Sequence, residues 1–353
     1  MEAAVTGTVE NNAGRRLRIA QVAPVATAIP TPRCGSIELI TSLLTEGLVR
    51  RGHDVTLFAT ADSKTSAKLS AIYRRGYWQD DGMWPWEFCE MMNLAAACER
   101  AGEFDVIHYQ APYYPLSLAF TRLISTPILH TVHHYPDPDQ VNLWRRYPKA
   151  NFAAISRCQY EAMSGLNRVG IVYHGIDTQS FTFRADPEDY LLFLGRFTAQ
   201  KGPLEAIEIA KRLGMRLLLA APENDYYREA IKPQVDGRLI EYVGEVDHKE
   251  KNRLLGGALA LLYPVQSSEP FGLVLVEAMA CGTPVAALRK GAVSELIVNG
   301  INGYYADDLE QLIELMPRVL EIDRAGARRN TVERFDAGRM VDEYIRVYQR
   351  LIA

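Results

Sequence analysis

The sequence predicts an α/β protein with two doubly wound, Rossmann-like domains, each built around a parallel sheet. Short apolar runs along the chain lack polar alternation, which is typical of strands covered on both faces. Amphipathic stretches separate these runs, as expected for βαβ units. The pattern stops after Val172 and begins again at Tyr190. Two successive domains of similar size are therefore predicted.

The predicted elements follow this alternation. The first domain is expected to have a helix at 36–51 and strands at 18–24, 55–59, 104–108, 126–131 and 152–155. The second is expected to have helices at 203–213, 309–322 and 325–334 and strands at 190–195, 216–221, 239–243, 258–263 and 284–288. The predicted organisation is a disordered tail at 1–15, an N-terminal domain at 16–180, a C-terminal domain at 181–335 and a terminal amphipathic helix at 336–353.

Composition argues against several classes of protein. With 39 basic and 43 acidic side chains among 353 residues, the formal net charge is −4, so no basic field favours nucleic acid as a partner. No apolar run approaches the ~20 residues that cross a bilayer, and the chain begins without a signal pattern. Five scattered cysteines without a C-x-x-C pair favour reduced thiols and a cytoplasmic location.

A short basic cluster bears on a possible membrane contact. Arg145, Arg146 and Lys149 lie close together in the sequence and could touch anionic lipid at the inner face of a membrane. So short a cluster is usually just solvated. Peripheral membrane contact is therefore kept only as the less common alternative.

The most informative segment places Glu269 and Glu277 eight positions apart across the start of a predicted helix at 272–281. An apolar strand precedes this segment, and Gly282 is expected to end the helix in a left-handed conformation. The backbone N–H groups after Pro270 would then point out of the carboxyl edge of the sheet, where they can bind a phosphate. An ordinary helix with solvated or ion-paired acids is the alternative.

A second motif carries two cations on one loop. Gly195 ends a predicted strand, and Pro203 is expected at the first position of the following helix. Arg196 and Lys201 therefore share the connecting loop at the carboxyl edge of the second sheet. Two fixed cations suit a diphosphate whose terminal phosphate gains charge as it leaves. A solvated basic loop is the alternative.

Two further segments come from the first domain. Gly35 and Ser36 form a small-residue turn between the first strand and helix, where backbone N–H groups can approach a phosphate. A simple helix start with Ser36 as its cap is nearly as well supported. His130, His133 and His134 end another strand, but neighbouring side chains on a strand point to opposite faces, so a zinc site is not favoured. Asp137-Pro138-Asp139 is interpreted as a turn rather than a metal motif.

Together these motifs resemble those of retaining, nucleotide-sugar-dependent glycosyltransferases of family 4. Residues 269–285 are similar to the E-x7-E signature of that family, 195–202 to its G-R-x4-K-G element and 131–133 to its Thr-x-His. Residues 291–295 resemble its G-x-x-x-E turn, which is more often structural than catalytic. The chain departs from the family pattern at Ser36, where a second glycine is usual, and at His174, where the linker usually has Asn.

The resemblance implies a GT-B fold with a ligand cleft between a 16–180 acceptor-side domain and a 181–335 donor domain, and a terminal helix that crosses back onto the first domain. It implies metal-independent transfer of a hexosyl group, with retention, from a nucleoside-diphosphate sugar to an acceptor hydroxyl. Uridine diphosphate sugars are the commonest donors among relatives, and no cofactor is expected. The implied catalytic residues are His133, Glu269, Arg196 and Lys201. The implied donor-binding residues are Gly35, Ser36, Arg196, Lys201, Val243, Gly244, Glu269, Phe271, Gly272, Leu273 and Glu277.

Other functions stay open from the sequence. A GT-B glycoside phosphorylase or a nucleotide-sugar epimerase would share the motifs, and a non-catalytic nucleotide-sugar binding module would keep only the donor site. A dehydrogenase or a P-loop enzyme is disfavoured because the chain contains neither G-x-G nor G-x4-G-K-[ST]. The acceptor is unspecified: a sugar, a glycolipid or a small molecule. Aromatic residues at 77–88 could cover an acceptor, although ordinary packing is favoured.

Overall fold

The computed structural model describes residues 15–31, 35–112 and 114–353 and contains two all-parallel sheets. Except for Arg15, the tail expected at 1–15 lies outside the described residues. The strands of the N-terminal sheet are β1 (Arg18–Val22), β2 (Asp54–Phe58), β3 (Lys68–Ser70), β4 (Val106–Tyr109), β5 (Ile128–Thr131), β6 (Asn151–Ala154) and β7 (Asn167–Ile171), in the order β3-β2-β1-β4-β5-β6-β7. Those of the C-terminal sheet are β8 (Leu191–Leu194), β9 (Leu217–Ala220), β10 (Ile240–Gly244), β11 (Ala260–Tyr263), β12 (Val285–Leu288) and β13 (Gly303–Ala306), in the order β10-β9-β8-β11-β12-β13.

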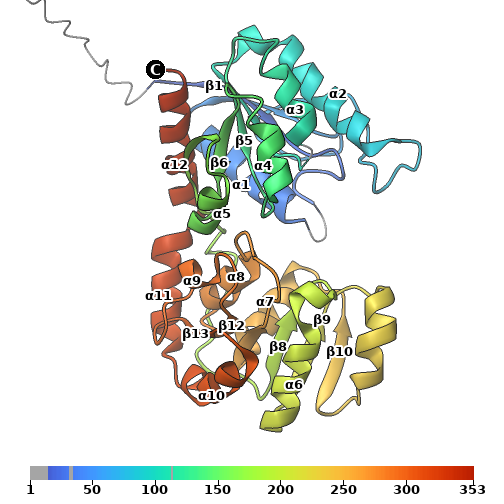
Figure 1. Cartoon of the computed structure of the whole chain (residues 1–353), viewed down its shortest axis with the longest axis vertical. Helices are drawn as coiled ribbons and strands as arrows, with labels where there is room; N and C mark the ends of the chain where they lie inside the picture. The colour runs from blue at the N-terminus through green and yellow to red at the C-terminus, as the bar shows by residue number, and fades with distance from the viewer. Residues whose placement is uncertain (1–14, 32–34, 113) are drawn as a thin grey trace, which may run out of the picture.

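Helices connect the strands and cover both sheets, which stand one above the other along the long axis of the molecule (Figure 1). The N-terminal domain contains α1 (Ser36–Arg50), α2 (Trp86–Glu99), α3 (Tyr114–Phe120), α4 (Pro138–Trp144) and α5 (Arg157–Ala162). The C-terminal half contains α6 (Pro203–Leu213), α7 (His248–Gly257), α8 (Leu273–Ala280), α9 (Val293–Leu296), α10 (Leu309–Leu320), α11 (Arg324–Phe335) and α12 (Ala337–Leu351). Within the described ranges, no helix combines the length and the apolar character that crossing a bilayer requires.

The predicted interior strands are confirmed, whereas three of the four edge strands were not anticipated. The missed strands are β3, β7 and β13, each of which pairs with a single neighbour at the border of its sheet. Their residues are partly exposed, so they lack the continuous apolar run that a strand covered on both faces carries. Sequence patterns therefore found the strands that are buried on both faces and, of the four border strands, only β10.

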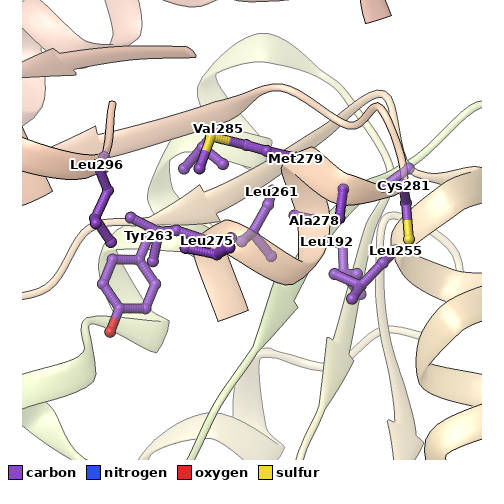
Figure 2. Packing of buried hydrophobic residues seen from close by; sticks show 14 of the residues in the cluster. Leu192, Leu255, Leu261, Tyr263, Leu275, Ala278, Met279, Cys281, Val285 and Leu296 are labelled. Carbon is purple, nitrogen blue, oxygen red and sulfur yellow. The ribbon is translucent and has the colours of Figure 1, made fainter. Parts of the chain in front are cut away.

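The helix α8 is deeply embedded in the C-terminal domain, with every residue from Leu275 to Ala280 buried. Leu275, Ala278 and Met279 are completely buried and belong to the same apolar cluster as Leu261 of β11 (Figure 2). Gly282 follows the helix with a φ of 90°, so the predicted left-handed stop is confirmed. This packing fixes the start of α8 relative to the end of β11, the two places that carry the Glu269 loop.

The terminal helix lies on the N-terminal domain. Met340, Tyr344 and Tyr348 of α12 are completely buried in the apolar cluster that also contains the inner face of α1. At Gly47 of α1, an added Cβ would stand 2.4 Å from a methyl group of Val341, so only glycine allows the two helices to approach this closely. Figure 1 shows α11 and α12 running along one side of both sheets. The end of the chain thus ties the two domains together.

Several ionisable side chains are buried. Burial lowers the pKa of His108 to about 3, of His130 to about 4 and of His174 to about 3, so all three rings are neutral in the folded protein at pH 7. Burial acts in the opposite direction on a carboxyl group and raises the pKa of Glu90 on α2 to about 8.

We expect the free energy of unfolding to fall as the pH is lowered from about 6.5 to about 5. In this range the histidines of the unfolded chain, with a pKa near 6.5, bind protons that the three folded rings do not. Each ring then adds a slope of up to about 1.4 kcal/mol per pH unit. Glu90 changes the free energy of unfolding in the opposite direction, because its carboxyl group keeps a proton in the folded protein and loses it above pH 4.5 in the unfolded chain. Urea unfolding at a series of pH values measures the combined effect of the three histidines and Glu90 on the free energy of unfolding.

The control is Glu90→Gln, which removes the opposing slope and should make the loss of stability below pH 6.5 steeper. A free energy of unfolding that stays constant or rises on acidification through this range would contradict the burial of neutral histidines.

Candidate active site

The carboxyl ends of the strands place the motif residues of the C-terminal domain along one edge of its sheet. Arg196 follows β8, Glu269 lies in the loop after β11, and Val243 and Gly244 end β10. Because all strands are parallel, these positions share the edge at which ligands bind in open α/β sheets.

The loop that carries Lys201 is held close to the end of β11. Gly202 has a φ of 74°, and an added Cβ would stand 2.0 Å from the carbonyl oxygen of Pro264, so glycine is required there on both counts. The backbone N–H of Gln266 also donates to the carbonyl of Gln200 at 2.8 Å. This close approach brings the cation of one motif to the carboxylate of the other.

Lys201 and Glu269 form an ion pair at the centre of the site. The Nζ atom of Lys201 lies 2.6 Å from Oε2 of Glu269 and 3.2 Å from the hydroxyl of Tyr263. The Tyr263 hydroxyl donates to the same carboxylate oxygen. Burial and the neighbouring carboxylate raise the pKa of Tyr263 well above its usual value, against the smaller effect of the Arg196 charge. Tyr263 was not anticipated, because in the sequence it reads only as the end of an apolar strand.

The backbone of the Glu269 loop is fixed from the other side by the turn before α9. The Ala292 N–H donates to the Glu269 carbonyl at 2.8 Å. At Gly291, where φ is 57°, an added Cβ would lie 2.2 Å from that carbonyl oxygen. The G-x-x-x-E turn therefore holds the loop in place.

The start of α8 presents backbone donors beside this loop. Gly272 occupies the cap position with a φ of 100°, and no side chain caps the helix. The first N–H groups of an α-helix have no partner within the helix and favour an anion. The Phe271 side chain is buried, so this residue can offer a ligand only its backbone.

Glu277 lies on α8 and is also paired. The Nζ atom of Lys251, on α7, lies 2.6 Å from Oε1 of Glu277, whose side chain is almost fully buried. Nothing in the sequence singled out Lys251, which is one of several charged residues in the first half of α7.

The remaining donor-side residues are open to solvent. Arg196 is exposed and forms no ion pair with any residue that the structure describes. Val243 is 38% exposed at the border of the sheet, beside Gly244 with its φ of 86°. An exposed apolar side chain next to an open glycine leaves room for a flat ring.

The N-terminal domain reaches this site through two histidines. The ring of His133, which follows β5, stacks on that of His174 with 5.2 Å between centroids. His174 in turn packs edge-on against Phe271 at 5.1 Å. Leu273 contacts the apolar clusters of both domains. The carboxyl edges of the two sheets therefore face each other, and His133 meets the start of α8 across the boundary.

The turn after β1 is described only in part. Pro32, Arg33 and Cys34 of the third motif lie outside the described residues. Gly35 occupies the cap position of α1 and Ser36 is its first helical residue, so Ser36 as the helix cap is wrong. Ser36 is exposed at the same edge of the sheet as His133. The predicted start of the helix at residue 36 is confirmed, and only the alternative with Ser36 as the cap fails, because glycine can also occupy a cap.

Glu295 links the two domains directly. Its carboxylate accepts the backbone N–H groups of Arg157 at 2.7 Å and of Cys158 at 2.8 Å, at the start of α5 in the N-terminal domain. It also accepts the hydroxyl of Tyr173 at 2.7 Å. Glu295 therefore has a structural role: its carboxylate bridges the two domains beside the candidate site.

One other expectation needs correction. Asp137 does not sit in a turn: its side chain caps α4 by accepting the N–H of Gln140 at 2.8 Å. In the aromatic segment Tyr77 is buried and stacks on Trp86, whose ring also packs edge-on against Trp84. Four residues of the segment are nevertheless 42–70% exposed, so packing and an acceptor cover both stay predictions: Trp78, Trp84, Trp86 and Phe88. In the described ranges no group of three His, Cys, Asp or Glu side chains is arranged to hold a metal. Metal independence itself stays a prediction.

A hollow of about 350 Å³ in the C-terminal domain lies elsewhere. Its lining includes Leu259 and Pro284, which directly precede β11 and β12. It therefore opens at the amino edge of the sheet, opposite the Lys201–Glu269 pair. Because its lining includes none of Arg196, Lys201, Glu269 and Glu277, we place the candidate site at the carboxyl edge.

Two family models match the chain. The model for glycosyltransferase family 4 matches residues 37–180, and that for group 1 glycosyl transferases matches residues 176–335. The chain is 32% identical over 179 residues to the glycogen synthase of Mycobacterium tuberculosis, covering 47% of this chain and 43% of that protein. It is 27% identical over 280 residues to the phosphatidyl-myo-inositol mannosyltransferase of Mycobacterium leprae, covering 70% of this chain and 74% of that protein. The chain thus spans less than half the length of the glycogen synthase it matches.

A solved structure shares the whole architecture. HepE from Anabaena, in complex with UDP-glucose, superimposes with a TM-score of 0.70 at 18% identity, and the match covers 95% of this chain and 100% of that one. The likeness establishes the GT-B fold. With this fold, and with two glycosyltransferase models that together account for residues 37–335, the chain belongs to glycosyltransferase family 4.

Proposed function

We propose that the protein transfers a hexosyl group from a nucleoside-diphosphate sugar to an acceptor hydroxyl, with retention at the anomeric carbon and without a metal. The observation that carries the proposal is the Lys201–Glu269 pair beside the uncapped start of α8. This arrangement brings a cation and backbone N–H donors together, and both would stabilise the charge of a leaving diphosphate. The carboxylate of Glu269 lies beside them and can accept hydrogen bonds from the hydroxyls of a sugar.

The cations and the helix start would hold the pyrophosphate. Arg196, Lys201 and the N–H groups of Phe271, Gly272 and Leu273 would stabilise the charge that grows on the leaving phosphate. Such preorganised contacts are typically worth about 3–4 kcal/mol of barrier each, since they need no reorganisation during the reaction. Lys201 is suited to this because its contact with Glu269 already fixes its ammonium group at the edge of the sheet.

The carboxylates would hold the sugars. Glu269 would orient hydroxyls of the donor sugar near the developing oxocarbenium charge, and His133 would support the same sugar from the N-terminal domain. Glu277 would accept hydrogen bonds from the ribose hydroxyls, with Lys251 compensating its buried charge. Val243 and Gly244, at the border strand, would lie beside the base. The anomeric bond to the phosphate breaks as the acceptor oxygen attacks from the same face, and the acceptor proton passes to the leaving phosphate.

Uridine diphosphate is the proposed nucleotide and UDP-glucose the first donor to try. The support is that HepE, which shares the fold, is solved with UDP-glucose. The acceptor is not specified by the contacts described above. We place it on the N-terminal side, near four exposed aromatic residues that precede α2 or lie in its first turn: Trp78, Trp84, Trp86 and Phe88. A cytoplasmic location, with or without a peripheral membrane contact, stays part of this proposal.

Three related activities are separable by simple incubations. A nucleotide-sugar epimerase would convert the donor without any acceptor. A glycoside phosphorylase would need inorganic phosphate as a reactant. A binding module would bind the donor and turn over no acceptor.

We expect donor turnover to persist in excess EDTA and to fall in Arg196→Ala, Lys201→Ala and Glu277→Ala. The kcat should fall by about 100-fold or more for Arg196→Ala and Lys201→Ala, since each substitution removes a positive side chain that would stabilise the leaving phosphate. For Glu277→Ala we expect mainly a higher KM for the donor, because ribose binding is equal in ground and transition state. Release of nucleoside diphosphate measures all three.

Lys211→Ala and Arg212→Ala are matched controls: both remove an exposed cation from the same domain, on α6 away from the sheet edge. They should keep the activity of the parent protein. Turnover that requires a metal, or that survives all three site changes, would end this mechanism.

We expect Gly291→Ala to weaken donor binding and turnover, because its Cβ would collide with the backbone of Glu269. Gly237→Ala is the control: that residue also has a positive φ, 72°, but an added Cβ there meets nothing within 4 Å. Both variants should lose stability of about 1–2 kcal/mol from the left-handed conformation alone. Equal catalytic efficiency in the two would contradict the role of the turn in holding the Glu269 loop.

A further inference from the structure

A chain of buried polar side chains connects His133 to the terminal helix. It consists of groups with no exposed surface that lie on neighbouring strands and on α12: Gln21, His108, Gln110, Thr131, Tyr344 and Tyr348. Gln110 is its inner end, because its Oε1 lies 2.9 Å from Nε2 of His133. Tyr348 is its outer end, where its hydroxyl lies 2.9 Å from Nε2 of Gln21 and 2.6 Å from Nδ1 of His108.

The amide of Gln21 and the neutral ring of His108 set a consistent direction for the hydrogen bonds from Gln21 to Thr131. Gln21 donates through Nε2 to the Tyr348 hydroxyl, so the hydroxyl donates its own proton to Nδ1 of His108. Because burial keeps His108 neutral, its proton is then on Nε2 and is donated to Thr131 at 2.7 Å. The hydroxyl of Thr131 lies 2.8 Å from that of Tyr344.

The amide of Gln110 is oriented by the same chain. Its Nε2 lies 3.4 Å from Oε1 of Gln21, and 3.3 Å and 3.2 Å from Nδ1 and Nε2 of His108. The lone pair of Nδ1 already accepts the Tyr348 hydroxyl, so the acceptor that the amino group of the Gln110 amide faces is the carbonyl oxygen of Gln21. The amide oxygen of Gln110 therefore faces His133, whose Nε2 must carry the proton.

We propose that Gln110 is a positioning residue of the candidate site, which holds the His133 ring in one orientation and one tautomer, and that Tyr348 of the terminal helix fixes Gln110 through Gln21. The inference rests on the proposed function for its catalytic consequence, since His133 is the residue of the N-terminal domain that meets Phe271 through His174. The structural statement about the tautomer stands on the contacts alone.

The terminal helix α12 therefore does more than pack against the N-terminal domain: it also supports the orientation of His133. A buried polar network is stable only when each member has its partner, so loss of one hydroxyl at α12 disturbs the orientation of the groups beyond it. A small displacement of a group that supports the sugar is enough to lower the rate, by as much as about 100-fold for 1 Å.

The experiment is nitrogen-15 NMR of the histidine side chains of the full-length protein, with His133 assigned by substitution, together with steady-state kinetics. In the parent protein we expect the His133 ring to be neutral, with its proton on Nε2. In Gln110→Met, which keeps the volume and removes the amide, we expect a mixture of tautomers. The kcat for transfer should fall about 10- to 100-fold, and the dissociation constant for UDP should be unchanged because the nucleotide binds the other domain.

Tyr348→Phe removes one hydroxyl at the far end of the chain and is the milder variant. It should shift the His133 tautomer and lower kcat in the same direction as Gln110→Met. Tyr190→Phe is its matched control: this tyrosine is equally buried in the other domain, where its hydroxyl donates to the Leu254 carbonyl at 2.9 Å. The control should lose comparable stability and keep both the tautomer and kcat.

The outcomes separate this inference from the proposed function. A parent protein that transfers no sugar to any acceptor refutes the proposed function, while the tautomer measurement still tests the positioning. If His133 keeps a single Nε2–H tautomer in Gln110→Met, or if Tyr190→Phe changes the ring as much as Tyr348→Phe does, the inference is overturned.

Discussion

The buried carboxylate of Glu269 is the constraint on which the candidate site depends. Only 7% of this residue is exposed, and a buried charge that loses its partner costs about 3–5 kcal/mol. Lys201 therefore has to reach it, and Tyr263 adds a hydrogen bond to the same oxygen. The requirement extends to the backbone, since the Lys201 loop can approach the end of β11 only with glycine at position 202. One electrostatic pair thus explains why two motifs 68 residues apart are found together.

The same site needs both domains, and the contacts between them are specific. Glu295 caps the start of α5 from across the boundary, and His174 inserts between His133 and Phe271. The terminal helix adds a third connection through its buried tyrosines. Most of these contacts are polar or aromatic, and Leu273 adds an aliphatic one. Polar boundaries of this kind are typical of domains that can adjust when a ligand binds. The geometry of the site therefore depends on a small set of named side chains.

Sequence reasoning succeeded where a single physical rule decides the structure. Interior strands, the stop of α8 at Gly282 and the pairing of the two motif loops at one sheet edge follow from burial, glycine conformation and parallel topology. It failed where the decisive partner is distant and ordinary. Lys251 and Tyr263 complete the surroundings of the two glutamates, yet neither carries a local signal. The sequence also did not predict three of the edge strands, the N-cap of α1 or the Gln110 network, because these features depend on tertiary contacts.

The most direct test of the account is a crystal structure of the protein with UDP-glucose. The account predicts the pyrophosphate between Arg196, Lys201 and the first N–H groups of α8, with the sugar between Glu269 and His133. A nucleotide bound elsewhere, such as in the hollow at the amino edge beside Leu259 and Pro284, would contradict it.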